Sequence, residues 1–541
     1  MTSPNSSYSN PIIPGDWSDP GVVRVGEDYY SVRSTFGWQP ALHVAHSRDL
    51  IHWRVIGYAD DQNALKLTPG ETDDGVWGSD IGYNPNNKTF LIYAPVHAKI
   101  HVFSSKDPAG PYTHHGEVID GYDPGFFADE NGQTYLTRTG GDIFRLTADG
   151  LKIQEGPVSS LPEGEGPEIF QRGEYYYYIT SPGGTRPYQD HMIMSYRAPS
   201  MEGPWEEDPS NPIMHAPHTT GAKLQGPGHG EVFNTQNGEW FLTYHAYELS
   251  HYSLGRQMGM EAVVWKDDDW WTTQNGPLPS ESNPLPQLPA STQGMVQSDN
   301  YDSHQLGKQW FFHTKPDFKG TLWSLSENPG SLRIHPQQGD LSSPKVMPTT
   351  FHQRVTSKEF DVITHIDFEA SSSGSAAGLH FYHDPKRNFW LTSTNVKGER
   401  VFEVGYYNLP YHSDVDPEGL RPPQVKEILK TSKVKKTILT QVPNTIGSKV
   451  YLKIHVDGQE NATFFFSKGG QQWQPIDASI YFGDSWHCSR LGKKPGAPDL
   501  GWVGCGRSNV WTGTTMGVFS CRETKEHGPP ANFNFFKVEV G

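Results

Sequence analysis

Three carboxylate residues stand at matching places in a recurring sequence unit. Asp19, Asp123 and Glu165 each come about ten to twelve residues before a short segment rich in aromatic residues. Hydrolysis of a glycosidic bond needs a carboxylic acid that protonates the leaving oxygen and a carboxylate that activates water or attacks the sugar. A third carboxylate can orient the acid and raise its pKa by like-charge repulsion. We therefore expect acid–base chemistry of this kind if the fold brings the three residues to one cavity.

Each of these residues also has a purely structural interpretation. Asp-Pro-Gly, which contains Asp19 and again Asp123, is a common turn in which the Asp side chain bonds its own backbone. Glu165 lies in an acidic run with Glu163 and Glu168, as in a solvated loop. The shared register favours the catalytic interpretation. It also favours Glu165 over Glu168 as the acid, because Glu168 lies three residues later and out of register.

The unit that sets this register is a polar turn followed by an aromatic strand. Each copy predicts a hairpin, since turn residues reverse the chain and alternating aromatic and aliphatic residues suit a half-buried strand. Copies begin 41 to 65 residues apart, as expected for four-stranded blades, and occupy residues 26–32, 87–93, 131–136, 172–178 and 237–242. The repeat predicts a five-bladed β-propeller; a generic β-sandwich with chance hairpins is the alternative.

The two remaining copies place other residue types at the position held by the carboxylates. The second blade has Ser79–Asp80 there and the fifth has His229. In a propeller the innermost strands start near the axis, so these positions should converge. Because they differ from blade to blade, we expect one asymmetric site. A non-catalytic carbohydrate-binding propeller would instead need several equivalent sites.

The whole chain is predicted to be all-β, with two domains. Residues 1–274 hold the propeller, and residues 275–298 are rich in Pro and Ser, as in a linker. Residues 299–541 contain runs with a period of two, among them 360–368 and 450–456. Such runs predict a β-sandwich of the jelly-roll, concanavalin-like type.

Several motifs, in order along the chain, carry a family resemblance. They are Asn10-Pro11-Ile12, Asp19-Pro20 with Arg24, Tyr122-Asp123-Pro124, Glu165-Gly166-Pro167, Pro227-Gly228-His229-Gly230 and Leu254-Gly255-Arg256. Residues 10 to about 272 resemble glycoside hydrolase family 43, which contains β-xylosidases and α-L-arabinofuranosidases. The segments 306–310 and 323–325 resemble the concanavalin-like sandwich appended to many of its exo-enzymes.

The resemblance implies an inverting mechanism. Asp19 would be the general base, Glu165 the general acid, and Asp123 the residue that orients Glu165 and tunes its pKa. Inversion predicts carboxyl groups of Asp19 and Glu165 roughly 6.5–9.5 Å apart, against roughly 5–5.5 Å for retention. Glu168 replaces the His that usually ends the signature around the acid, which puts the leaving-group subsite in question.

The resemblance also implies substrate-binding and metal residues. Arg256 matches a sugar-binding arginine, with a salt bridge within a blade as the alternative. Trp77 and Trp38 match aromatic walls of the terminal-sugar pocket, with core packing as the alternative, and the remaining candidates are Phe36 and Tyr122. His229 matches a histidine over the central channel, where the family often holds a hydrated calcium. No cofactor is required for the chemistry, and calcium prefers oxygen ligands, so a structural calcium remains an open expectation.

The leading hypothesis is an exo-acting α-L-arabinofuranosidase that releases side chains of arabinoxylan or its oligosaccharides. The alternative is a β-D-xylosidase that trims xylooligosaccharides, and one site could do both because the two terminal pentoses present similar hydroxyls. A fructan-cleaving hydrolase would carry Cys after the acid. Here Gly166 follows Glu165, and all the cysteines lie near the C-terminus, outside the predicted propeller.

Composition limits the partners and the compartment. The net charge of −17 argues against nucleic acid, and no stretch approaches 18 consecutive apolar residues, so no membrane span is expected. Cys488, Cys505 and Cys521 allow one disulfide but no disulfide framework. The expected polysaccharide substrate favours an extracellular enzyme, whereas the start of the chain shows no signal segment, which keeps the cytoplasm open. The sequence predicts no oligomeric state.

Overall fold

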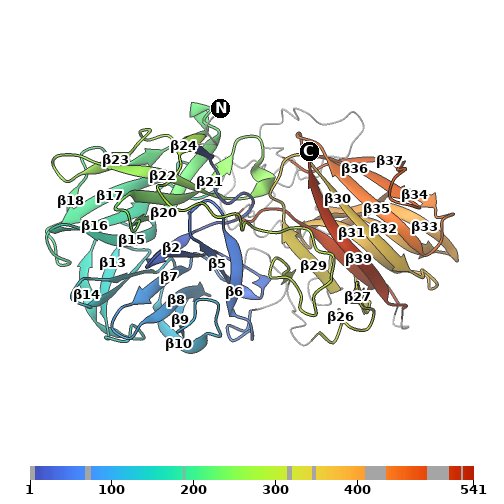
Figure 1. The fold of residues 1–541 in the computed structure, drawn as a ribbon, viewed down its shortest axis with the longest axis horizontal. Coiled ribbons are helices and arrows are strands. Elements are labelled where there is room, and N and C mark those ends of the chain that lie inside the picture. The colour runs from blue at the N-terminus through green and yellow to red at the C-terminus, as the bar shows by residue number, and fades with distance from the viewer. Residues whose placement is uncertain are drawn as a thin grey trace.

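The protein is almost entirely β-structure. The computed structural model describes residues 7–67, 75–186, 189–313, 320–343, 349–408, 434–483, 511–524 and 528–541. The helical segments in these ranges are two 3-10 turns, η1 (His218–Thr220) and η2 (Tyr252–Leu254). Figure 1 shows a ring of sheets, blue to green, beside a two-layer sandwich, yellow to red. In the ranges described, no helix is both long enough and apolar enough to cross a membrane.

The ring consists of five antiparallel sheets. From the innermost strand outward, the first blade contains β2 (Gly21–Val25), β3 (Asp28–Val32), β5 (Ala41–Ser47) and β6 (Arg54–Asp60), and the second contains β7 (Asp80–Asn84), β8 (Thr89–Val96), β9 (Lys99–Ser105) and β10 (Thr113–Asp120). The third blade contains β11 (Gly125–Ala128), β12 (Thr134–Arg138), β13 (Asp142–Leu146) and β14 (Ile153–Ser160), and the fourth contains β15 (Glu165–Arg172), β16 (Tyr175–Ser181), β17 (Met192–Ala198) and β18 (Glu206–Glu207), with β19 (Met214–His215) beside β17. The fifth blade contains β20 (Leu224–Asn234), β21 (Trp240–Glu248), β22 (Gln257–Trp265) and β23 (Trp271–Thr273). Around the ring β2 contacts β7, β7 contacts β11, β11 contacts β15, β15 contacts β20 and β20 contacts β2. This arrangement confirms the predicted five-bladed propeller.

The alternation of apolar residues along the blade strands follows from packing on both faces. In β8, Phe90 and Ile92 belong to a core shared with the first blade, whereas Leu91 and Tyr93 belong to a core shared with the third. Successive strand residues point to opposite faces of a sheet, so each blade can bury both faces against its neighbours. Every pair of adjacent blades shares such a core in the part of the chain described.

The start of the chain is tied to the last blade. β1 (Ser7–Ser9) pairs with β24 (Ser282–Pro284), which lies within the segment predicted to be a linker. The hydroxyl group of Tyr8 donates to the backbone oxygen of Met260 at 2.9 Å. These contacts hold the first and last blades together where the ring closes.

The second domain is a sandwich of two sheets, as predicted. In spatial order, one sheet contains β26 (Trp323–Ser324), β27 (Leu332–Ile334), β39 (Ala531–Val540), β30 (Phe360–Phe368), β35 (Lys449–Val456), β36 (Asn461–Ser467) and β37 (Gln474–Tyr481), and the other contains β28 (Gln337–Gln338), β38 (Thr515–Arg522), β31 (Ser375–Asp384), β32 (Arg387–Val396), β33 (Glu399–Asn408) and β34 (Lys435–Pro443), with β29 (Thr349–Arg354) beside β38. Phe381, Phe389 and Phe464 fill the space between the sheets.

The two domains are packed together through a two-stranded sheet and shared apolar residues. β4 (Trp38–Gln39) of the propeller pairs with β25 (Phe312–His313). Tyr247, Tyr252 and Leu254 of the last blade belong to the core of the sandwich. The residues just after Leu254 are therefore held between the domains, beside the centre of the propeller.

Candidate active site

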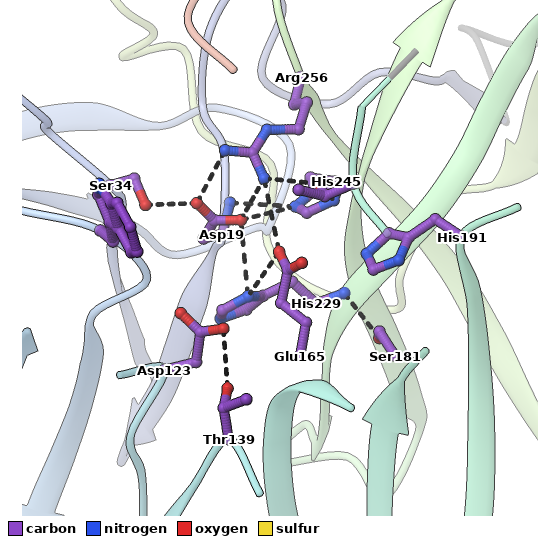
Figure 2. A network of polar contacts seen from close by, with 12 residues as sticks. Asp19, Ser34, Asp123, Thr139, Glu165, Ser181, His191, His229, His245 and Arg256 are labelled. Atoms are coloured by element: carbon purple, nitrogen blue, oxygen red, sulfur yellow. Dashed lines mark hydrogen bonds and ion pairs between the residues drawn. The ribbon is translucent and has the colours of Figure 1, made fainter. Parts of the chain in front are cut away.

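Three of the residues predicted at the propeller axis share an unusual backbone conformation. Asp19, Asp123 and His229 have φ angles of 54°, 48° and 49°. Left-handed backbone is uncommon outside glycine, and it persists at functional sites where the surrounding structure holds it. Asp19 and Asp123 come just before the innermost strands β2 and β11, Glu165 is the first residue of β15, and His229 lies at an irregular part of β20. Figure 2 shows these residues converging on one another.

Asp19 is a buried carboxylate held by several donors. Arg256 contacts both of its oxygens, with Nη1 2.6 Å from Oδ1 and Nη2 3.0 Å from Oδ2. The Ser34 hydroxyl donates to Oδ2, and His245 Nδ1 lies 3.0 Å from Oδ1 (Figure 2). Burial would raise the pKa of Asp19, but Arg256 and the two histidines His245 and His229 outweigh burial and hold this pKa well below its ordinary value. The group is therefore ionised and able to accept a proton.

Glu165 lies near the same Nη1 of Arg256 that Asp19 contacts. Its Oε1 lies 3.7 Å from Arg256 Nη1 and 3.8 Å from His229 Nδ1, and its side chain is 22% exposed. Burial raises the pKa of Glu165, but the nearby His229, His191 and Arg256 together bring this pKa below its ordinary value. At 3.8 Å the contact with His229 is too long for a hydrogen bond, so the attraction is Coulombic.

The pKa values of Asp123 and His229 are both raised. Burial and the charges of Glu165 and Asp19 raise the pKa of Asp123 to about 7, against the opposing effect of His229. Thr139 donates a hydrogen bond of 3.1 Å to Asp123 Oδ2. Burial lowers the pKa of His229, but the carboxylates of Glu165, Asp19 and Asp123 raise it to about 9. A positive imidazolium therefore lies among three carboxyl groups.

Asp19 and Glu165 share the same cations. Arg256 and His229 each lie against both carboxylates. One oxygen of Asp19 and one oxygen of Glu165 lie within 4.8 Å of each other. The expected separation of 6.5–9.5 Å refers to the carboxyl groups as wholes and stays a prediction.

Exposed aromatic side chains form a row beside the carboxyl groups. Trp77 is 36% exposed and Tyr122, the neighbour of Asp123 in the chain, is 39% exposed. Their ring centroids are 6.0 Å apart, and the Trp77 ring lies 5.8 Å from that of Trp511 in the sandwich domain. Two predicted aromatic residues thus lie at the site, with a partner from the second domain. Exposed aromatic faces of this kind suit the C–H faces of sugars.

Trp38 does not belong to this row, and its expected role in the sugar pocket is corrected. Its side chain is 1% exposed and packs in the domain interface against Phe311, His352 and Tyr382. The reason is β4, which pairs with β25 and directs the ring toward the sandwich. Phe36 is buried as well, two residues from Ser34. The expected contact of Phe36 with sugar stays a prediction.

Sequence reasoning missed several residues of the site. His245 on β21, His191 before β17, and Thr185 surround Arg256 and Glu165, and Thr185 Oγ1 accepts a 2.9 Å hydrogen bond from Arg256 Nη1. They stand outside the repeated register, so no signal in the sequence marked them. Trp511 belongs to the sandwich domain, far along the chain from the propeller, and its backbone oxygen lies 3.4 Å from Arg256 Nε.

Two glycines explain how the sandwich reaches the site. A Cβ on Gly255 would lie 2.6 Å from the nitrogen of Gly513. Only residues without side chains allow the two backbones to approach this closely. Gly255 precedes Arg256, and Gly513 comes two residues after Trp511, so this contact sets Trp511 beside the arginine.

A second group of carboxyls lies in the propeller near the first. Asp80, Glu168 and Glu231 have oxygens within 4.8 Å of one another. Burial raises the pKa of Asp80 to about 6, and burial and mutual repulsion raise the pKa of Glu168 and of Glu231 well above the ordinary value. Asp80 thus belongs to a different cluster of carboxyl groups from Asp19 and Asp123, although the repeat aligned the three residues. Glu168 also belongs to this group. The residue that replaces the histidine usual in the family therefore lies among these carboxyl groups.

These carboxyl groups suit calcium better than His229 does. Calcium takes oxygen ligands, which Asp80, Glu168 and Glu231 provide together. The surrounding carboxylates raise the pKa of His229 to about 9, and the expected hydrated calcium beside His229 stays a prediction. The imidazolium neutralises Asp19 and Glu165.

Comparison with known proteins identifies relatives of both domains. The family model "Glycosyl hydrolases family 43" matches residues 8–271, and the model "Beta xylosidase C-terminal Concanavalin A-like domain" matches residues 298–539. A non-reducing end α-L-arabinofuranosidase of Bacteroides ovatus is 29% identical over 73% of this chain and 77% of its own. A β-xylosidase of Bacillus subtilis is 26% identical over 98% of this chain and 99% of its own.

A solved structure extends the similarity to the whole fold. A GH43 protein from Bacillus licheniformis matches 99% of this chain and 100% of its own, with a TM-score of 0.83 and 26% identity. The propeller, the sandwich and their order are therefore shared with a protein of known structure.

Proposed function

The chain belongs to glycosyl hydrolase family 43, and from this premise we propose that it releases terminal α-L-arabinofuranosyl units from arabinoxylan or its oligosaccharides. The observation that carries the proposal is the placement of Asp19 and Glu165 against the same Nη1 of Arg256, near the aromatic residues Trp77 and Tyr122. The carboxyl groups supply acid and base, and the aromatic rings supply faces for a terminal sugar.

Asp19 is the proposed general base. Both of its oxygens already accept hydrogen bonds, from Arg256 and from Ser34, so the group suits proton transfer from water better than a bond to the sugar carbon. In this mechanism water attacks the anomeric carbon and gives its proton to Asp19. The glycosidic bond breaks on the other side, with inversion. The anomer first released distinguishes inversion from retention.

Glu165 is the proposed general acid, and Asp123 is the proposed residue that keeps a proton within its reach. Glu165 raises the pKa of Asp123, and two carboxyl groups that interact in this way titrate as a pair. Because the pKa of Asp123 is about 7, the pair holds one proton in weakly acidic solution. Glu165, the more exposed member, gives that proton to the leaving oxygen. Asp123 opposes the ionisation of Glu165 before this transfer.

A β-D-xylosidase is the second candidate, and the names of the relatives support it. The β-xylosidase of Bacillus subtilis matches 98% of this chain, and a xylan 1,3-β-xylosidase of a Vibrio species is 28% identical over 74% of the chain. Both candidates remove a terminal pentose. The same residues would serve either sugar, because the chemistry at the anomeric carbon is common to both.

Paired assays test the proposal. Hydrolysis of nitrophenyl α-L-arabinofuranoside in preference to nitrophenyl β-D-xyloside supports the first candidate, and the reverse preference supports the second. NMR of the first product formed reports the anomer, and we expect inversion. Activity confined to internal linkages of xylan would refute both candidates.

We also propose a structural calcium in the propeller. Asp80, Glu168 and Glu231 would hold the ion, whose charge would offset the mutual repulsion of these buried carboxylates. Calcium would supply no step of the hydrolysis. Its role would be to stabilise the inner strands β7, β15 and β20, which carry the three residues.

A further inference from the structure

A cavity lies in the sandwich domain, far along the chain from the carboxyl groups of the propeller. Its volume is about 200 Å³, and strands β31, β32, β33, β34 and β38 contribute to its lining. The residues that matter for its chemistry are Trp390, Thr392, Glu403, Tyr407, Lys436 and Glu523.

These residues lie on the face of their sheet that points away from the sandwich core. On β32, Phe389 and Leu391 belong to the core, so the alternation of side chains sends Trp390 and Thr392 to the other face. Trp390 and Tyr407 pack there with ring centroids 5.2 Å apart. Both rings line the cavity although they are only 4% and 5% exposed, so the cavity lies over an aromatic pair that is otherwise buried.

Polar groups surround the aromatic pair. Trp390 Nε1 donates to Glu403 Oε1 at 3.3 Å. Lys436 Nζ donates to Glu523 Oε1 at 2.9 Å and lies 5.8 Å above the Trp390 ring. The hydroxyl of Thr392, a residue only 1% exposed, has no hydrogen-bond partner within the part of the chain described. A buried hydroxyl without a partner is costly, so it indicates a ligand that can bond it.

The charges and hydroxyl groups select the chemistry of the ligand. Asp340, Glu403 and Glu523 disfavour an anion, and Lys436 is already paired with Glu523. The unpartnered hydroxyl of Thr392 disfavours a purely apolar ligand. A neutral molecule that combines C–H faces with many hydroxyl groups meets both conditions, and sugars are such molecules.

The cavity is on the same sheet face as the contact with the propeller. On β31, Tyr382 touches the Trp38 ring and Ala376 lines the cavity. Six residues of strand separate them, or about 20 Å. β38 makes the same connection, since it begins four residues after Trp511 and carries Cys521 at the cavity. A polysaccharide chain can therefore reach both places.

We propose that this cavity is a second, non-catalytic sugar-binding site, which holds a pentose unit of the polysaccharide whose chain ends enter the propeller. The inference rests on the proposed function for the identity of the sugar. Glu403 and Glu523 are held by Trp390 and Lys436, so the site binds and does not hydrolyse. Its effect would be to retain the enzyme on polymer.

The test uses the full chain with Glu165→Gln added to prevent hydrolysis, and measures binding to arabinoxylan in affinity gels and to xylotetraose by calorimetry. Trp390→Ala should weaken polymer binding at least about tenfold, as loss of a central aromatic contact does. Ser373→Trp, at an exposed residue of the rim, should block the cavity without removing core atoms. Trp473→Ala, on the other sheet, is the matched control and should bind as the parent does.

A second readout separates this proposal from the proposed function. In the active enzyme, Trp390→Ala and Ser373→Trp should leave kcat/KM for nitrophenyl pentosides within about twofold while slowing release of sugar from polymer. Folded variants that bind arabinoxylan as tightly as the parent would overturn the second site. If no nitrophenyl pentoside is cleaved, the proposed function fails, and the binding measurements still decide the cavity.

Discussion

Arg256 binds Asp19 through both of its Nη atoms, at 2.6 and 3.0 Å, and the same Nη1 lies 3.7 Å from Glu165. Bidentate pairing of this kind fixes the plane of a carboxylate as well as its charge. One side chain therefore sets the orientation of the base and attracts the acid. The position of Arg256 depends in turn on the Gly255–Gly513 contact between the domains.

Asp19→Asn and Glu165→Gln should each abolish most hydrolysis while the protein stays folded. We expect kcat to fall by about 10² to 10⁴, the usual contribution of a general acid or base. Glu165→Gln should impair natural oligosaccharides more than nitrophenyl glycosides, because nitrophenolate leaves without a proton. Glu163→Gln, at an exposed residue nearby, is the control. Wild-type rates in either catalytic variant would refute the assignment.

Asp123→Asn should move the alkaline limb of the kcat/KM profile to lower pH. Asp123 and Glu165 repel each other when both are ionised, so a neutral amide in place of Asp123 removes that repulsion and lets Glu165 lose its proton at lower pH. A shift of about one pH unit is expected, measured between pH 4 and 9 on one nitrophenyl substrate. Asp120→Asn on the exposed end of β10 should leave the limb in place. An unchanged or upward shift with Asp123→Asn would contradict the coupling.

Trp77 and Trp511 should act together on substrate binding. Their rings meet edge to face at 5.8 Å across the domain boundary. In a double-mutant cycle on kcat/KM, Trp77→Ala and Trp511→Ala should show a coupling energy of about 0.5–1.5 kcal/mol. Additive effects of the two substitutions would show that the sandwich does not shape the sugar site through this contact. The thermal midpoint of each variant serves as the check on folding.

Trp38→Ala should destabilise the protein and spare its chemistry. The side chain is 1% exposed and packs against Phe311 and Tyr382 in the interface, so its loss should lower the free energy of unfolding by about 3–5 kcal/mol. Denaturant titration measures this loss. The KM of the folded fraction should remain close to that of the parent. A large rise in KM with unchanged stability would restore Trp38 to the sugar pocket.

Calcium should raise the thermal midpoint of protein first treated with EDTA. The three carboxylates of Asp80, Glu168 and Glu231 repel one another when ionised, and a divalent cation removes that repulsion. Glu168→Gln should abolish both the shift and the heat of calcium binding in calorimetry. Glu163→Gln should keep both. A midpoint insensitive to calcium at millimolar concentration would refute the site.

The sequence by itself determined the blades and the register of their axial residues. A hairpin depends on local turn chemistry and on the period of two along a strand, and both are visible in a few consecutive residues. Because equivalent strands converge on one axis, register alone placed Asp19, Asp123, Glu165 and His229 near one another. The match of Arg256 to a family motif added the positively charged side chain that binds Asp19.

Only the tertiary structure decided which of these charged side chains meet one another and which residues the second domain contributes to the site. Asp80 shares the register of Asp19, yet its side chain joins Glu168 and Glu231, because small differences in where each inner strand begins change which side chains meet. Trp38, which was expected in the sugar pocket, is buried in the domain interface, whereas Trp511, for which no role was expected, lies against Trp77 at the site. Their positions follow from contacts between residues hundreds of positions apart, which no local pattern records.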